Sequence, residues 1–133
     1  MKAVWVDANV LIRLLTNDSP EHADRSERLL RRAGRGDLLL VVPVVVIAEV
    51  VWTLASFYRY ERIKIADGLQ SLVTADGVAV EAADTVLDAL TLMAEHNVDF
   101  ADAYIAAAAT RRGEEVATFD ADLKRLGARV VAF

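Results

Sequence analysis

The chain has 133 residues, of which 55% are hydrophobic, and its net charge is −5. This length fits one domain, residues 1–133, and the apolar content is enough for a core and argues against disorder. The absence of cysteine excludes disulfides and thiolate metal sites. The apolar run after Lys2 is too short for a secretory signal, and the run at 38–48, broken by Pro43, is too short to span a bilayer. We expect a cytoplasmic domain without a membrane segment.

The N-terminal stretch predicts a strand that ends in a carboxylate. Residues 3–6 are apolar, Asp7 follows directly, and a helical pattern runs from Asn9 to Thr16. In open α/β sheets, ligands bind at the carboxyl ends of the strands. Asp7 has an alternative role as the cap of the following helix, because Asp accepts hydrogen bonds from N–H groups in the first turn.

The second predicted helix begins with Ser19 as cap and Pro20 in its first position, and it ends at Gly34. Five arginines at 25–35 alternate with acids at i,i+4 spacing, which favours a solvated face over an RNA-contacting one. The pI is about 5.0, whereas nucleic-acid binders usually carry a basic face. We take the acidic balance as weak evidence against a nucleic-acid substrate.

The rest of the chain alternates between strands and helices. The predicted strands are 38–42, expected to be buried on both faces, 78–80, 116–119 and 129–133. One predicted helix starts at Pro43, and two more span residues 60–75 and 84–95. A fourth starts at Asp99 and ends at Gly113. This alternation predicts a mostly parallel sheet with helices on both faces.

Four acids occupy comparable places in this pattern. Asp7 and Asp120 follow strands, whereas Glu49 and Asp102 lie in the first turns of helices. Right-handed crossovers bring such positions to one edge of the sheet, where the carboxylates would repel each other unless a cation neutralised them. Oxygen ligands without His or Cys suit Mg²⁺ or Mn²⁺. The pattern therefore predicts a divalent-metal enzyme that acts on phosphates, with Asp99 as a helix cap.

The same residues carry a resemblance to a known family, the PIN-domain ribonucleases. The opening motif Val-Asp-Ala-Asn, an Ala-Glu-Val early in a helix, an Asp-Phe-Ala-Asp-Ala-Tyr segment and a late Thr-Phe-Asp each resemble one of its acidic motifs. They stand at residues 6–9, 48–50, 99–104 and 118–120. Their order and spacing match over nearly the whole chain, and the compact length resembles the VapC toxins of toxin–antitoxin pairs.

This resemblance implies a PIN-like three-layer α/β fold with about five parallel strands, in which the strands before Asp7 and Asp120 lie side by side. It also implies hydrolysis of RNA phosphodiester bonds, which leaves a 5′-phosphate and a 3′-hydroxyl. The implied ligands of one or two Mg²⁺ or Mn²⁺ ions are Asp7, Glu49, Asp102 and Asp120. The implied supporting residues are Asn9, Thr118 and Asp122, although a capping or solvated role suits Asp122 slightly better.

The resemblance further implies a homodimer that acts on RNA and is inhibited by a small antitoxin, which often inserts a basic side chain into the acidic pocket. Four aromatic residues at the end of the third predicted helix either face such a partner or complete the core. They are Trp52, Phe57, Tyr58 and Tyr60. The two histidines, His22 and His96, lie outside every motif, which disfavours a histidine-based ribonuclease mechanism.

Three other classes of protein fit the sequence less well. A haloacid-dehalogenase-like phosphatase requires Asp where Asn9 stands and a distinct lysine, for which Lys64 and Lys124 are the candidates. A receiver domain requires a phospho-accepting Asp at the end of a central strand, and residues 41–43 offer none. A non-catalytic partner-binding domain would have no reason to confine four carboxylates. The sequence leaves the RNA target open.

Overall fold

The computed structural model of the protein describes all 133 residues. The strands are β1 (Lys2–Trp5), β2 (Leu38–Val42), β3 (Val78–Val80), β4 (Glu115–Val116) and β5 (Arg129–Val130). The helices are α1 (Ala8–Leu15), α2 (Pro20–Gly34), α3 (Val44–Ser56), α4 (Arg62–Val73), α5 (Ala83–His96), α6 (Phe100–Arg112) and α7 (Asp122–Arg125). No helix combines the length and the apolar character that crossing a membrane requires.

The strands form two separate parallel sheets. One has the order β1-β2-β3, with Val4 opposite Leu40 and Leu40 opposite Val78, and the other pairs β4 with β5. The predicted α/β class with a parallel sheet is confirmed. The prediction of about five strands in one sheet is wrong for the single chain, and β1 does not lie beside β4. The cause is the packing of α6 against α5 and α3, which leads the chain away from β1 before β4 begins.

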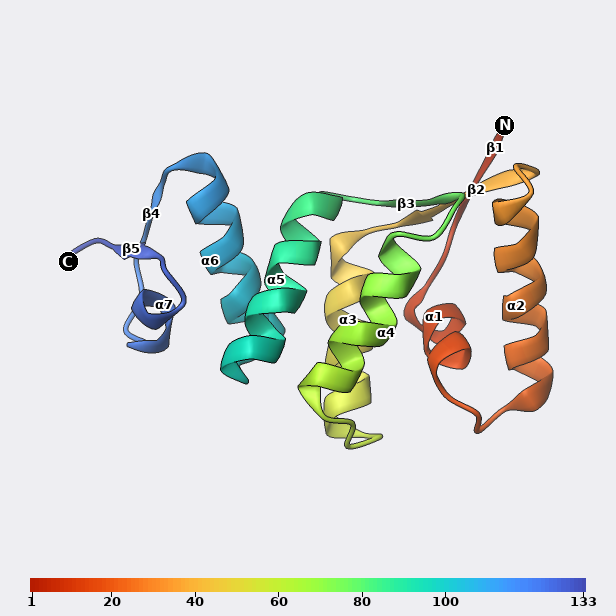
Figure 1. The fold of residues 1–133 in the computed structure, drawn as a ribbon, viewed down its shortest axis with the longest axis horizontal. Coiled ribbons are helices and arrows are strands. Elements are labelled where there is room, and N and C mark those ends of the chain that lie inside the picture. The colour runs from red at the N-terminus through yellow and green to blue at the C-terminus, as the bar shows by residue number, and fades with distance from the viewer.

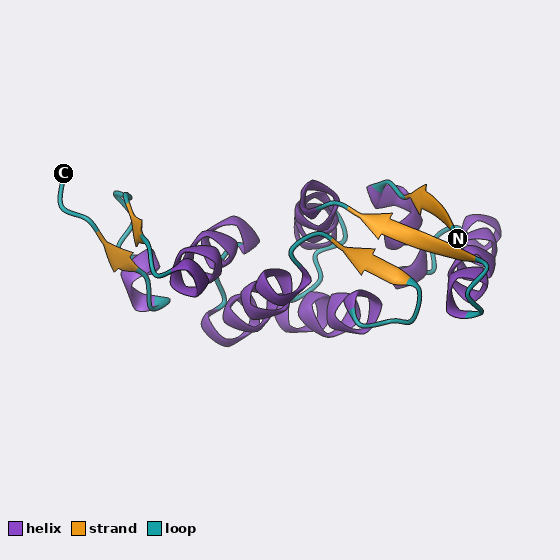
Figure 2. Cartoon of the chain, turned by 90° about the horizontal axis from the view of Figure 1, so that it is seen from above, coloured by secondary structure: helices purple, strands orange, loops and turns teal.

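The molecule is elongated, and its two sheets lie near opposite ends. Figure 1 shows β1, β2 and α1–α4 towards the end that carries the N-terminus, and β4, α7 and β5 at the end that carries the C-terminus. Helices α5 and α6 stand between the two ends. Seen from above in Figure 2, the same separation holds, so it is not an effect of one viewing direction.

The main core is built around β2. Leu40 and Val42 are almost fully buried among side chains of α1, α2, α3, α4 and β3, because every second residue of a strand points to the same face. Leu39 and Val41, on the other face, are only half-buried. The prediction that this strand is buried on both faces is therefore only half right.

The edge strands are more exposed and shorter than predicted. Trp5 in β1 is 70% exposed, because the sheet adds no strand beyond β1. The strands predicted at 116–119 and 129–133 shrink to two residues each, since β4 and β5 have only one another as neighbours. Helix boundaries agree with the sequence to within a few residues: α4, predicted at 60–75, spans Arg62–Val73.

The arginine-rich helix α2 has an exposed, ion-paired face. Arg28 pairs with Asp24 at 3.5 Å and Arg31 pairs with Glu27 at 3.8 Å, each at i,i+4 spacing. Such exposed pairs contribute little to stability and keep the helix solvated. They agree with the solvated face that the sequence favours.

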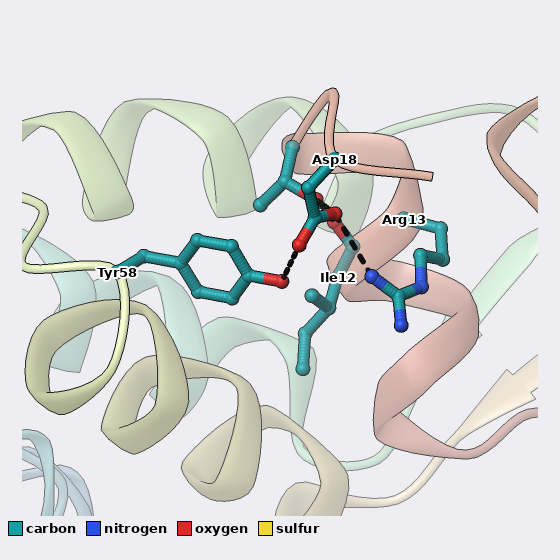
Figure 3. Close-up of polar contacts among 5 residues, drawn as sticks. Ile12, Arg13, Asp18 and Tyr58 are labelled. Atoms are coloured by element: carbon teal, nitrogen blue, oxygen red, sulfur yellow. Dashed lines mark hydrogen bonds and ion pairs between the residues drawn. The ribbon is translucent and has the colours of Figure 1, made fainter. Parts of the chain in front are cut away.

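A polar junction at Asp18 connects the α1–α2 link to the end of α3 (Figure 3). The carboxylate of Asp18 accepts hydrogen bonds from the Tyr58 hydroxyl at 2.5 Å and from the Arg13 guanidinium at 2.8 Å. The Thr16 hydroxyl lies 3.0 Å from both Asp18 and the carbonyl oxygen of Ile12. The hydrogen bond from Tyr58 is the largest cause of the lowered pKa of Asp18.

Candidate active site

Asp7 caps helix α1. Its backbone is extended, and its carboxylate accepts a hydrogen bond from the N–H of Val10 at 3.3 Å. Capping was the alternative role for this residue, and the structure shows that role directly. The side chain is exposed and forms no ion pair, so the cap leaves oxygen lone pairs free for a cation. Asn9, in the first turn of the same helix, is also exposed.

Glu49 lies on α3 and lines a cleft of about 1380 Å³. The cleft runs between α3, the start of α4 and the start of α6, and Trp52, Arg62 and Asp99 also line it. The carboxylate of Glu49 forms no ion pair or hydrogen bond within the chain.

Asp102 occupies the first turn of α6 and is partly buried. Its pKa is raised above the ordinary range, first because burial disfavours its charged form and then because of the negative charges of Asp120, Asp99 and Asp122. Asp99 holds the N-cap position of α6, as predicted, but its side chain does not cap. It pairs instead with Arg62 at 2.6 Å.

Asp120 sits in the loop between β4 and α7. Its N–H donates to the Thr118 hydroxyl at 2.9 Å, and its carboxylate accepts from the N–H of Asp122 at 2.9 Å. These bonds hold the loop in a tight turn. Asp122 begins α7 and pairs with Arg125 at 3.4 Å, which agrees with a solvated acid better than with a metal ligand.

The four principal acids share one property: none of them pairs with a Lys or Arg, whereas Asp99 and Asp122 do. Within the single chain, however, no three acids or histidines lie close enough to hold a metal ion. The negative charge of Asp120 contributes to the raised pKa of Asp102. Asp7 and Glu49 belong to the other half of the chain, which carries the main sheet. The four carboxylates are therefore the type of ligand that Mg²⁺ or Mn²⁺ prefers, but their positions within one chain do not form a metal site.

Arg62 is a residue that the sequence does not single out. Its guanidinium donates to Asn97 at 3.1 Å and to Asp99 at 2.6 Å, and it lies in the cleft with Glu49. These partners lie 35 and 37 residues further along the chain, so no local sequence pattern predicts the two contacts. Through these two hydrogen bonds, Arg62 connects the start of α4 to the link between α5 and α6.

Comparison with known proteins places the chain in a family. The PIN domain family model matches residues 4–129, so the chain belongs to the PIN-domain family. All the candidate site residues lie inside the matched range. The chain is also similar to a VapC ribonuclease from Aquifex aeolicus (strain VF5), with 26% identity over 127 residues that cover 95% of this chain and 93% of that protein. The resemblance inferred from the acidic motifs is confirmed.

Proposed function

We propose that this protein is a divalent-metal-dependent endoribonuclease that acts as the toxin of a type II toxin–antitoxin pair. The observation that carries the proposal is the PIN-domain match over residues 4–129, which contains all four acidic motifs. The similarity to a VapC ribonuclease over 95% of the chain supports the same activity. This match also disfavours the phosphatase and receiver-domain alternatives.

Asp7, Glu49, Asp102 and Asp120 are the proposed metal ligands, because they combine the right donor atoms with freedom from basic partners. Mg²⁺ or Mn²⁺ bound by them would supply Lewis acidity toward a phosphodiester group. Asn9 lies beside Asp7 in the first turn of α1. The Thr118 hydroxyl fixes the backbone of Asp120, so its proposed role is to position that carboxylate.

The proposed antitoxin surface is the cleft that contains Glu49. Trp52 lines it and is 68% exposed, and Ile63 lines it and is 57% exposed. Tyr60 also lines this cleft and is half-buried against the core. An antitoxin that places apolar side chains on Trp52 and a basic group near Glu49 would match the chemistry of this cleft.

The decisive experiment is cleavage of a mixed RNA pool by purified protein with Mg²⁺, with Mn²⁺ and with EDTA. We expect metal-dependent cleavage by the native chain and a loss of at least about 100-fold in Asp7→Asn, since even residues behind metal ligands cost 10–100-fold. Asn caps helices as well as Asp does, so this variant keeps the fold.

The matched control is Asp67→Asn, because Asp67 is an exposed acid on α4 without an ion pair and outside every acidic motif. It should cleave like the native chain. Full metal-dependent cleavage by Asp7→Asn would rule out the assigned site. No cleavage by the folded native chain in either metal would rule out the ribonuclease.

A further inference from the structure

Two exposed phenylalanines lie beside each other on the small β4-β5 sheet, at the end of the molecule that carries the C-terminus (Figure 1). Phe119 is 96% exposed and Phe133 is 74% exposed. β4 pairs in parallel with β5, with Glu115 opposite Arg129. The same register, continued beyond the two strands, places Phe119 opposite Phe133, and their ring centroids lie 4.9 Å apart. The two rings therefore form a cross-strand aromatic pair.

The aromatic pair lies on the solvent-exposed face of this sheet. Side chains alternate between the two faces of a strand, so Ala117 and Phe119 share one face and Val116 points to the other. Val116 is buried, whereas Ala117 and Phe119 are exposed. Phe133 contacts Phe119 at an interplanar angle of 48° and leaves its ring almost fully in solvent. Packing of the core does not explain two adjacent exposed aromatic rings, which are typical of an interaction site.

The aromatic pair adjoins an acid of the proposed active site. Phe119 lies between Thr118 and Asp120, and the Thr118 hydroxyl accepts a hydrogen bond from the Asp120 N–H at 2.9 Å. The Asp120 carboxylate accepts from the N–H of Asp122, also at 2.9 Å. These bonds fix the backbone around Phe119 at the carboxyl end of a parallel strand, where ligands bind in α/β proteins. A phosphodiester held at Asp120, as the proposed function requires, would have a flanking nucleotide beside Phe119.

The segment that carries the aromatic pair also differs in charge from the rest of the chain. Residues 103–133 contain five basic and four acidic residues, a net charge of +1, whereas residues 1–102 contain ten basic and sixteen acidic residues, a net charge of −6. Lys124 in α7 forms no ion pair, and Arg129 in β5 donates to the carbonyl of Gly113 and has no acidic partner. Both cations can therefore attract a phosphate group. This charge favours an anionic ligand with flat aromatic parts over an apolar protein surface.

We propose that the Phe119–Phe133 pair is a stacking platform for an unpaired nucleobase of the RNA substrate, an inference that rests on the proposed function. One face of the base stacks on the ring of Phe119, which Phe133 supports from the side. Aromatic side chains hold single-stranded RNA in this way, and they accept any base because every base has a π-face. A base inside a duplex has both faces covered by its neighbours. The platform therefore selects single-stranded segments and loops rather than a particular base.

Binding of a short fluorescein-labelled single-stranded RNA in EDTA, measured by fluorescence anisotropy, tests the platform without any cleavage. Phe119→Ala should weaken binding at least about fivefold, the lower end of what one stacked base contributes. Phe119→Tyr keeps an aromatic ring and should restore the native affinity. Because Phe119 is 96% exposed, neither change removes a side chain from the core.

The matched control is Phe57→Ala. Phe57 is 75% exposed and also belongs to an aromatic pair, with its ring centroid 5.1 Å from that of Tyr58. It follows α3 in the acidic part of the chain, away from the β4-β5 sheet. Phe57→Ala should bind the single-stranded RNA like the native chain.

The same RNA annealed to its complement is the second probe. Phe119→Ala should not change the affinity for this duplex, since none of its bases is free to stack. No loss of affinity for the single strand, or an equal loss for single strand and duplex, would overturn the platform. A change in the sedimentation of Phe119→Ala without a change in RNA affinity would overturn it too, because the aromatic pair would then join copies of the chain. The absence of RNA binding by the folded native chain would have the same consequence.

The binding measurement separates the platform from the ribonuclease activity. A native chain that binds single-stranded RNA through Phe119 but cleaves nothing with Mg²⁺ or Mn²⁺ would refute the ribonuclease and leave the platform standing. A native chain that cleaves RNA, beside a Phe119→Ala variant that binds and cleaves equally well, would refute the platform alone.

Discussion

Among single residues, Asp18 shows how one carboxylate can connect two links of the chain. It receives hydrogen bonds from Tyr58 and Arg13, and these lower its pKa. The same contact raises the pKa of Tyr58, chiefly because the hydroxyl proton is held by Asp18. Asp18 is exposed and Tyr58 is half-buried, so the ionic part of this junction is screened by solvent and contributes little to the free energy of unfolding.

The Tyr58→Phe variant should lower the urea midpoint of unfolding slightly at neutral pH. Because the pKa of Asp18 is depressed, its contribution is present above the pKa of the unfolded state and is lost as the pH falls through the folded value. The difference between variant and native chain should therefore begin to shrink near pH 4, the ordinary pKa of an unfolded Asp, and disappear only below the lowered pKa of folded Asp18. Because the pKa of Tyr58 is raised, the difference should also vanish at strongly alkaline pH.

Tyr60→Phe is the matched control, since the Tyr60 hydroxyl forms no hydrogen bond within the chain, and it should show no such pH dependence. A pH-independent loss in Tyr58→Phe would mean that the hydrogen bond to Asp18 does not exist in solution.

The positions of the proposed site residues could be predicted only in part from the local sequence. Local sequence indicated that Asp7 could cap a helix, and the structure has this cap, because capping is a local effect. Besides burial, the nearby charges of Asp120 and Asp122 raise the pKa of Asp102. That these residues lie near Asp102 depends on the tertiary fold and is not encoded in any local pattern.

Among the elements, the turn between α4 and β3 fixes how the main sheet meets α2. Gly77 has φ +79°, and a Cβ atom added there would lie 2.2 Å from the carbonyl oxygen of Ala33 in α2. The carbonyl of Gly77 also accepts a hydrogen bond from the N–H of Leu40 at 2.8 Å. A side chain at this position therefore meets both backbone strain and a collision with another backbone.

We expect Gly77→Ala to lower the free energy of unfolding by about 2–4 kcal/mol, since left-handed strain alone costs about 1–3 kcal/mol. Gly36→Ala is the control, because Gly36 has φ +85° with open space around the added Cβ, and it should lose only about 1–2 kcal/mol. Chemical unfolding of both variants measures the difference. Equal losses would show that α2 does not pack against this turn.

For the complete chain, the prediction that matters most is the environment of Trp5. The chain has two tryptophans, and Trp52→Phe leaves Trp5 as the only one. Trp5 is 70% exposed, so its emission should lie at long wavelength and dissolved iodide should quench it readily. Short-wavelength emission that iodide does not quench would mean that another surface covers Trp5 in solution.

The sequence by itself determined the elements and the family. Pro20, Pro43 and Gly113 marked helix ends, strand and helix periodicity marked the rest, and the acidic motifs identified the PIN domain. These signals lie within a few residues of one another or are carried by residue type. Only the tertiary structure decided which strands are neighbours. β1 and β4 are more than a hundred residues apart, and whether they meet depends on where α6 packs, a competition between non-local surfaces that no local pattern encodes.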